Sequence, residues 1–307
     1  MAEPKETVHG GDIYRNPSVT DYSVNSNPLG VPEAVRKSVQ ESADRIMYYP
    51  DVRCDILRES ISDFERIEKE KILCGNGAAE LFFAVVMAVR PKKALVTAPA
   101  FSEYERALGT VGAEVQYYRL KEEQDFRIQE DILEQITEDT DMIFLCNPNN
   151  PTGQTTEKEL LIRVMNRCNK CGTILVLDEC FIEFLEEPER YECRGYLTQY
   201  PNVVIIKAFT KIFCMPGVRL GYALCENAAL RKRMRWNVSV TAQEAGVAAL
   251  VDCEAYLKRT REYIKKEKFW MTEQMRKLGL NVWGSEANYI FFKGKAGLYE
   301  KALKSGL

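Results

Sequence analysis

Short apolar segments that alternate with helical patterns constrain the fold of this chain more than any other feature. Turn-forming residues bound each apolar segment, and amphipathic stretches such as 102–110 and 157–168 lie between them. The apolar segments are residues 94–98, 115–120, 142–146, 174–177, 203–206 and 220–225. This alternation is typical of a mainly parallel sheet with helices on both faces, because parallel strands need crossover connections. The sequence therefore predicts an α/β fold.

Further elements are expected on either side of this region. Helices are predicted at residues 31–42, 55–67, 78–89 and 254–278, the last of them long and charged. The helix at 55–67 is predicted to place a set of apolar side chains on one face: Ile56, Leu57, Ile61 and Phe64. The segment 74–77 has the composition of a glycine-rich turn, and 281–292 is predicted to form two strands.

Charge and hydropathy exclude several classes of function. The 42 basic and 45 acidic side chains leave a formal net charge of -3, so no overall field draws the protein to nucleic acid or to anionic lipid. No apolar run approaches the roughly 20 residues that cross a bilayer. The opening MAEPKETVHGGD has no apolar core of a secretion signal. A cytoplasmic protein without nucleic-acid or membrane partners is expected.

The cysteines and the histidine limit the possible chemistry further. Ten cysteines in a chain without a secretion signal are expected to be free thiols. Cys168 and Cys171 form a C-x-x-C pair, but no second pair and no nearby histidine accompany it, so a structural role is favoured over zinc or redox chemistry. No metal site is expected. His9 is the only histidine, which excludes mechanisms that need two imidazoles.

A lysine and an aspartate follow two of the predicted strands. Lys211 lies just beyond the segment KAFT, where α/β proteins place ligands at the mouth of the sheet. Burial there favours the neutral amine that Schiff-base chemistry requires, although a solvated loop lysine is the alternative. Asp178 ends ILVLDE and needs a cationic partner if it is buried. A protonated pyridine nitrogen is one such partner, and a helix N-cap or an arginine partner is the alternative.

Two loops add donors for a ligand. The string NPNNPTG at residues 147–153 fixes a turn in which Asn150 can point its amide in one direction. At 75–78, GNGA opens a predicted helix and offers backbone N–H groups to an anion. Arg219, in GVRLG, can add a bidentate contact to a phosphate. Taken separately, each loop also has an ordinary structural interpretation.

The motifs NNPTG, DECF, TK and GVRLG occur in an order and at separations that resemble fold-type I pyridoxal-phosphate (PLP) enzymes of the aminotransferase class I/II superfamily, over nearly all of residues 9–292. The resemblance implies PLP as the cofactor and a large domain with a mainly parallel seven-stranded sheet flanked by helices, plus a smaller α/β domain. It implies that Lys211 forms the imine, Asp178 pairs with the pyridine nitrogen and Asn150 donates to the ring O3′. The residues implied to hold the cofactor phosphate are Gly77, Ala78, Thr210 and Arg219.

The same resemblance extends to aromatic residues. Phe101 occupies the position at which the family stacks an aromatic side chain on the cofactor ring, with Tyr104 as the weaker candidate and a core role as the alternative for both. Tyr49 matches a tyrosine that reaches the phosphate of the neighbouring subunit's cofactor. A homodimer is therefore implied.

Two branches of the superfamily fit the sequence. HGGD at residues 9–12 and SVNSNPLG resemble threonine-phosphate decarboxylases of cobalamin biosynthesis, and histidinol-phosphate aminotransferases share the same cofactor machinery. Phe181 replaces a tyrosine that is usual in the aminotransferases, and Ala208 replaces a serine usual in the decarboxylases. His9 and Asn25 are candidates for gripping the substrate, a small phosphorylated amino acid.

The resemblance predicts decarboxylation of L-threonine O-3-phosphate to (R)-1-amino-2-propanol O-2-phosphate. Transfer of an amino group from histidinol phosphate to 2-oxoglutarate is the first alternative. A non-catalytic PLP-binding protein is the second, because the arginines that the family supplies from its C-terminal domain have no counterpart here.

The predicted domain organisation has three parts. Residues 1–45 form an N-terminal arm and part of a small domain, 46–245 the large PLP-binding domain, and 246–307 a linking helix and the rest of the small domain. An α/β domain that ends one helix after its second strand is incomplete. We therefore expect the C-terminal part to be truncated or to be completed by another chain.

Overall fold

A seven-stranded, mainly parallel sheet forms the centre of the computed structural model, which describes residues 10–11, 13–14, 17–234 and 237–306. The strand order is β1-β7-β6-β5-β4-β2-β3, and β7 is antiparallel to both of its neighbours. The strands are β1 (Ile72–Gly75), β2 (Lys93–Ala98), β3 (Glu114–Arg119), β4 (Met142–Cys146), β5 (Ile174–Asp178), β6 (Val203–Ala208) and β7 (Gly221–Cys225). The sheet predicted from the alternating pattern is confirmed.

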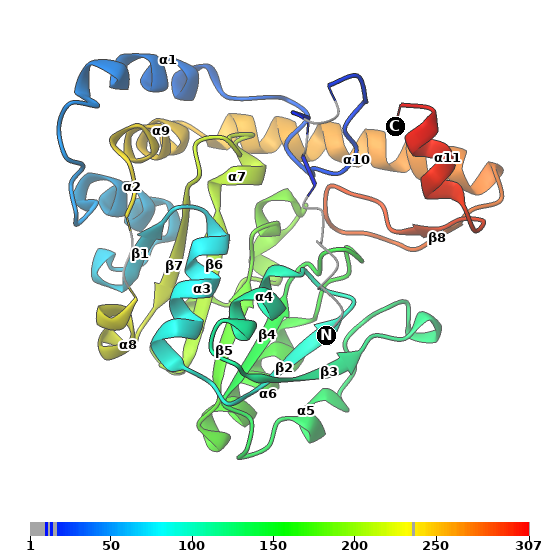
Figure 1. Cartoon of the computed structure of the whole chain (residues 1–307), viewed down its shortest axis with the longest axis horizontal. Coiled ribbons are helices and arrows are strands. Elements are labelled where there is room, and N and C mark those ends of the chain that lie inside the picture. Colours follow the sequence, from blue (N-terminus) through cyan, green and yellow to red (C-terminus); the bar gives the residue numbers. More distant parts are fainter. Residues whose placement is uncertain (1–9, 12, 15–16, 235–236, 307) are drawn as a thin grey trace.

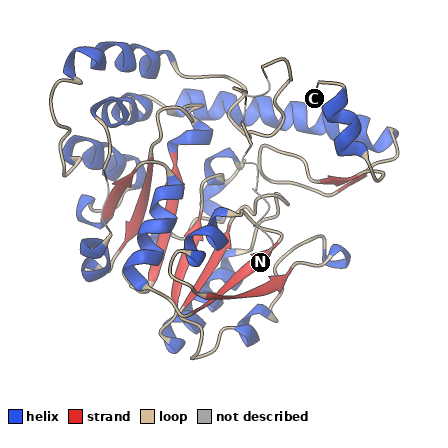
Figure 2. Cartoon of the chain, in the orientation of Figure 1, coloured by secondary structure: helices blue, strands red, loops and turns tan. Residues whose placement is uncertain are grey.

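Helices cover both faces and one end of this sheet (Figures 1 and 2). They are α1 (Glu33–Glu41), α2 (Asp55–Glu65), α3 (Ala78–Val89), α4 (Glu103–Gly109), α5 (Ile132–Gln135), α6 (Lys158–Cys171), α7 (Phe209–Ile212), α8 (Ala228–Arg233), α9 (Val240–Leu250), α10 (Glu254–Lys277) and α11 (Leu298–Lys304). In Figure 1, α1, α9 and α10 lie above the sheet, and α11 lies beside the far end of α10. A small second sheet pairs β8 (Asn281–Val282) with β9 (Phe292–Lys293).

The central helix α3 shows why these residues form this layer. Its sequence AAELFFAVVMAV is almost wholly apolar, and Leu81, Phe82, Val85 and Val86 are fully buried in the core. Burial of such side chains contributes roughly 1.5–3 kcal/mol each. None of the helices in the described ranges is both long and apolar enough to cross a membrane.

Two local predictions were wrong. Residues 72–75 form the edge strand β1, with every residue buried, whereas 74–77 was predicted as a turn. Ile56 is 74% exposed, although it was expected on the buried face of α2 with Leu57 and Ile61. Because each helical residue advances by 100°, Ile56 points away from the stripe that Leu57 and Ile61 form at i and i+4.

The cysteine prediction agrees with the structure. All ten cysteines are free thiols. Cys168 lies on the buried side of α6, where burial raises its pKa to about 12. Because the thiolate is the reactive form, this cysteine is inert at neutral pH. Among the described residues, no group of three or more His, Cys, Asp and Glu has the geometry of a metal site.

Candidate active site

The carboxyl ends of β4, β5 and β6 meet at one edge of the sheet, because these strands are parallel neighbours. Asn150 follows β4, Asp178 ends β5, and Lys211 follows β6 on the one-turn helix α7. In Figure 1, α7 continues from the upper end of β6 toward α10. The fold thus gathers three residues that lie far apart in the sequence, at the place where open α/β sheets bind ligands.

Lys211 has the electrostatic environment of an imine-forming lysine. Burial lowers its pKa below the ordinary lysine value, and the nearby Arg219 guanidinium lowers it further, against the opposing influence of Cys180 and Asp21. A lower pKa increases the fraction of neutral amine, which is the nucleophilic form.

Asp178 is a buried carboxylate, only 4% exposed. The Cys180 backbone N–H donates to its Oδ1 at 2.9 Å, and the Tyr104 hydroxyl donates to its Oδ2 at 2.5 Å. Burial raises its pKa, and these hydrogen bonds oppose the rise. No ion pair to Asp178 exists within the described part of the chain. A buried carboxylate without a cation suits the protonated ring nitrogen of a ligand.

Tyr104 is a site residue whose contact the sequence did not predict. Its side chain is fully buried and stacks on Phe144, with ring centroids 4.9 Å apart and an interplanar angle of 14°. Its hydroxyl donates a hydrogen bond to Asp178. Phe101 lies three residues earlier, in the loop before α4, with its ring edge-on to that of Tyr104 and the ring centroids 5.8 Å apart. The only sequence signal for the Tyr104 contact was the pair of aromatic residues at positions 101 and 104.

The turn after β4 is fixed by a set of short hydrogen bonds. The Gly153 backbone N–H donates to the Asn149 carbonyl at 2.7 Å, and the Asn149 amide donates to Pro99 O at 3.2 Å and to Thr152 Oγ1 at 2.9 Å. These bonds join the turn to the loop that carries Phe101. The neighbouring Asn150 side chain makes no hydrogen bond to the described residues, so its amide is available to a ligand.

At the start of α3, two glycines allow Arg219 and the strand β7 to approach the helix closely. Gly77 has a φ of +84°, and a Cβ there would lie 2.7 Å from Arg219 Nη2. A Cβ on Gly221 would lie 2.8 Å from the Ala78 backbone nitrogen. Glycine at both positions therefore allows the Arg219 guanidinium to lie next to the first backbone N–H groups of α3. Together these donors form a suitable cradle for a phosphate. The Thr210 hydroxyl makes no hydrogen bond within the described chain.

The remaining predicted residues lie elsewhere. Tyr49 is 99% exposed and so does not reach the site of its own chain. Asn25 lies in the N-terminal arm, where its carbonyl accepts a hydrogen bond from the Asn288 amide at 2.9 Å. His9 lies outside the described residues. Phe181 is buried edge-on against Tyr289, and Ala208 is buried at the end of β6.

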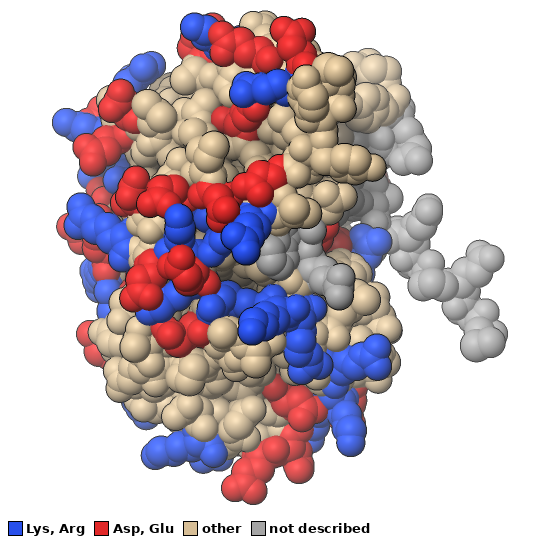
Figure 3. Space-filling model, turned by 90° about the vertical axis from the view of Figure 1, so that its left-hand side faces the viewer, with Lys and Arg blue, Asp and Glu red and all other residues tan. Residues whose placement is uncertain are grey.

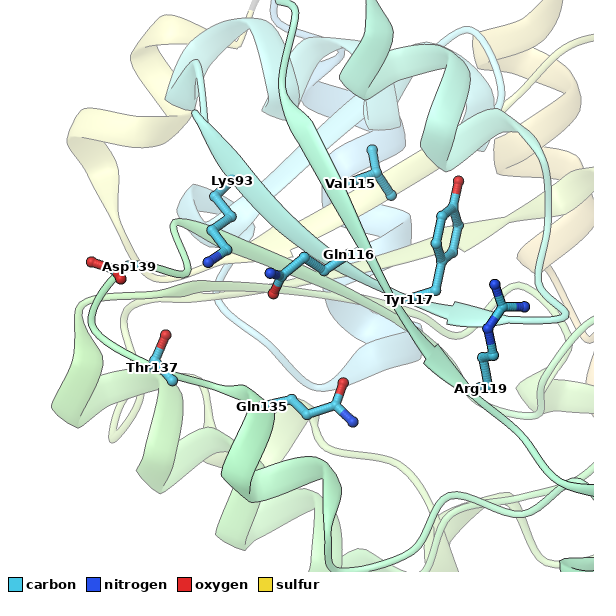
Figure 4. A pocket seen from close by; sticks show the side chains of 8 residues that line it. All are labelled: Lys93, Val115, Gln116, Tyr117, Arg119, Gln135, Thr137 and Asp139. Carbon is cyan, nitrogen blue, oxygen red and sulfur yellow. The ribbon is translucent and has the colours of Figure 1, made fainter.

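Hollows elsewhere on the surface do not coincide with this site. One, of about 660 Å³, lies along the outer edge of β3, and its lining side chains do not converge on one point (Figure 4). Another, of about 1060 Å³, lies between α2, the segment 183–194 and the start of α10. Neither contains a predicted site residue. Acidic and basic side chains are interspersed on the face shown in Figure 3, as the small net charge suggests.

Fold and site together define a PLP-dependent enzyme, because a lysine with a lowered pKa, a buried carboxylate and an anion cradle lie at one edge of the sheet. The chain belongs to the aminotransferase class I and II family, which it matches over residues 17–306. This confirms the resemblance, the fold and the cofactor.

Individual relatives carry two different activities in their names. The chain is 33% identical to the threonine-phosphate decarboxylase of Salmonella typhimurium, over 94% of this chain and 82% of the relative. It is 35% identical to a putative threonine-phosphate decarboxylase of Caldanaerobacter subterraneus, over 99% and 84%. The crystal structure of the histidinol-phosphate aminotransferase from Clostridium acetobutylicum superposes with a TM-score of 0.85 at 30% identity, over 92% and 86%.

Proposed function

We propose that this enzyme decarboxylates L-threonine O-3-phosphate to (R)-1-amino-2-propanol O-2-phosphate, a reaction of cobalamin biosynthesis. The observation that carries the proposal is similarity at 33% and 35% identity to two relatives named for this decarboxylase, over nearly the whole chain. Phe181 supports it, since the aminotransferase branch usually has a tyrosine there.

The residues of the site fit PLP, and each is assigned one contact. When PLP is bound, Lys211 Nζ would hold its aldehyde carbon, Asp178 would pair with the ring nitrogen, and Asn150 would donate to the ring O3′. Phe101 stacks on the ring. The phosphate is held by Gly77, Ala78, Thr210 and Arg219.

The bound cofactor supplies an electron-withdrawing ring that takes up the electron pair left when a bond to the substrate Cα breaks. The residues proposed to grip the substrate, Asn25 and His9, would determine which bond to Cα breaks by setting its orientation. Asp178 maintains the positive charge on the ring nitrogen. Lys211 Nζ would hold a proton that it can deliver to the substrate Cα.

The N-terminal arm is the proposed source of substrate contacts. The Asn27 backbone N–H donates to the Lys211 carbonyl at 2.9 Å, and the buried Asn27 amide donates to Ile212 O at 2.8 Å and Thr260 Oγ1 at 2.7 Å. These bonds attach the arm to α7 and α10, two residues away from Asn25. On this basis Asn25 is assigned, together with His9, to the substrate.

Product analysis tests this function. The PLP-loaded enzyme is incubated separately with threonine phosphate, serine phosphate and histidinol phosphate, with and without 2-oxoglutarate, and the products are identified by mass spectrometry. Formation of 1-amino-2-propanol phosphate and CO₂ without 2-oxoglutarate supports the proposal, and the Lys211→Ala variant serves as the inactive control. Amino transfer that depends on 2-oxoglutarate and releases no CO₂ contradicts it.

The second candidate function is amino transfer from histidinol phosphate. It is supported by the 30% identity to the Clostridium aminotransferase, a structure that covers 92% of this chain. Glutamate formed from 2-oxoglutarate in the same experiment would establish this alternative.

The proposed assembly is a homodimer in which Tyr49 contacts the cofactor phosphate of the second subunit. Exposed apolar side chains lie close to Tyr49 in the sequence, and burying them against a second copy would remove them from water. They are Ile46, Met47, Tyr48, Val52 and Ile56, all between 64% and 82% exposed.

A further inference from the structure

The contact between Tyr104 and Asp178 joins two of the most buried polar groups of the site. Tyr104 is 0% exposed and Asp178 is 4% exposed, and the hydroxyl oxygen lies 2.5 Å from Oδ2. Hydrogen bonds to ionised acceptors are shorter and stronger than those between neutral groups. The hydroxyl bond to Asp178 is therefore shielded from water rather than exposed at the surface.

The aromatic neighbours of Tyr104 fix the orientation of its ring and therefore the direction in which its hydroxyl points. Its ring is stacked on Phe144 at 4.9 Å and packed edge-to-face on Phe82 at 5.0 Å. Phe101 packs against a further edge at 5.8 Å. With the ring fixed on three sides, the hydroxyl stays pointed at the carboxylate.

The carboxylate in turn is held at both of its oxygens. Oδ1 accepts from the Cys180 backbone N–H, and Oδ2 accepts from Tyr104. An ionised carboxylate offers about four lone-pair sites, so these two bonds fix its plane and leave acceptor capacity for one cation.

We infer that Tyr104 is a positioning residue, which orients the Asp178 carboxylate toward the ring nitrogen of PLP and keeps it ionised. This inference rests on the proposed pairing of Asp178 with that nitrogen. Tyr104 touches neither substrate nor cofactor and acts only through Asp178.

The protonation states agree with this role. Burial, together with the charge of Asp178, raises the pKa of Tyr104 well above its ordinary value, so the phenol remains a donor throughout the neutral range. Burial also raises the pKa of Asp178, and the bonds from Cys180 and Tyr104 lower it again. Loss of the hydroxyl would shift this balance toward a neutral carboxyl group.

Cofactor affinity, measured separately from turnover, tests the inference. The dissociation constants of PLP and of its 1-deaza analogue, which has carbon in place of the ring nitrogen, are compared by spectroscopic titration of the cofactor-free protein. The preference for PLP over the analogue reports the Asp178 contact alone. Tyr104→Phe removes only the hydroxyl and keeps the ring contacts with Phe144 and Phe82.

A matched control exists on β7. The Tyr222 hydroxyl donates to the buried Glu65 carboxylate at 2.5 Å, away from the proposed ring contacts. Tyr222→Phe therefore deletes the same kind of bond, with similar consequences for folding, without altering Asp178.

The outcomes separate the inference from the assignment on which it rests. Tyr104→Phe is expected to reduce the preference for PLP roughly tenfold or more while affinity for the analogue changes little, and Tyr222→Phe is expected to keep the wild-type preference. A wild-type preference retained in Tyr104→Phe overturns the role of Tyr104 but not that of Asp178. A wild-type protein without any preference overturns both.

A second variant covers the case in which Tyr104→Phe does not fold. Tyr104→Met also removes the hydroxyl and replaces the ring by a flexible apolar side chain that can fill the space beside Phe144 and Phe82. A reduced preference for PLP in this variant supports the inference, and an unchanged preference overturns it. Thermal unfolding of the cofactor-free proteins establishes which variants are folded.

Discussion

Two lysines four residues apart have opposite electrostatic environments. Lys207, on β6, is 1% exposed, and although burial disfavours its charge, Glu183 and Glu65 outweigh this and hold its pKa well above the ordinary value. Lys211, just past the strand, has no carboxylate at salt-bridge distance among the described residues, and burial lowers its pKa. Of this pair, only Lys211 is suited to act as a neutral nucleophile.

Replacement of Lys211 by alanine is expected to abolish covalent attachment of PLP and to lower activity by at least about a hundredfold, because both the imine and the proton carrier are lost. Borohydride reduction of the wild-type holoenzyme followed by peptide mass spectrometry should find the cofactor on Lys211. Labelling of Lys207 instead would refute the assignment.

The buried acidic cluster around Lys207 predicts a pH dependence of stability. Burial raises the pKa of Glu179 from 4.5 to about 8, against the attraction of Lys207, and the charges of Glu192 and Glu65 add to the rise. When the pKa of a carboxyl group is higher in the folded protein than in the unfolded chain, the group does not destabilise the fold at any pH below its unfolded-state pKa. As the pH rises from about 4.5 to 8, Glu179 is expected to lower the free energy of unfolding by at most about 1.4 kcal/mol per pH unit.

Glu179→Gln is therefore expected to be more stable than the wild type at pH 8 and to differ little at pH 4.5. Urea unfolding at several pH values measures this difference. Glu189→Gln, a change at an exposed glutamate of the following loop, should leave the pH profile unchanged. Parallel profiles for the wild type and Glu179→Gln would show that Glu179 does not titrate in this range.

At the scale of elements, the start of α3 depends on a glycine. Gly77 has a φ of +84°, which L side chains rarely adopt, and its α-carbon faces the Arg219 guanidinium. The helix start and the arginine can therefore lie together only if this position has no side chain.

Gly77→Ala is expected to lower stability by about 1 kcal/mol or more and also to weaken PLP binding, because the new methyl group displaces Arg219. Gly172→Ala, at the end of α6, is the matched control: its φ is +73° and nothing lies within 4 Å of the new Cβ. That variant should lose stability but keep its affinity for PLP. Equal affinities in both variants would argue against the phosphate cradle.

At the scale of the whole molecule, the apolar surface near Tyr49 predicts self-association. Val52→Lys is expected to shift the protein from dimer to monomer and to weaken cofactor binding, since a charge at the interface of two copies is costly to bury. Leu278→Lys is the control, because Leu278 is 78% exposed and Val52 is 82% exposed. Sedimentation velocity measures the outcome, and a monomeric wild-type protein would contradict the proposed assembly.

Much of the fold was predictable because apolar periodicity is a local signal. Residues 142–146 and 78–89 were predicted as the strand and the helix that the structure contains, within the same limits. Strand β1 was missed because four residues ending in Cys74-Gly75 are too short for a pattern and are fixed by pairing with β7, which lies far along the chain. The predicted division into three domains stays a prediction.

By itself, the sequence determined the α/β class and the family, and it singled out Lys211, Asp178 and Asn150 as the proposed site residues, because motifs and strand ends are encoded in neighbouring residues. Only the tertiary structure decided what lies beside them. The Tyr104 contact with Asp178 spans 74 residues, and the Tyr289 hydroxyl bond that holds Asn149 spans 140. Such contacts depend on how distant elements pack, and no local pattern specifies them.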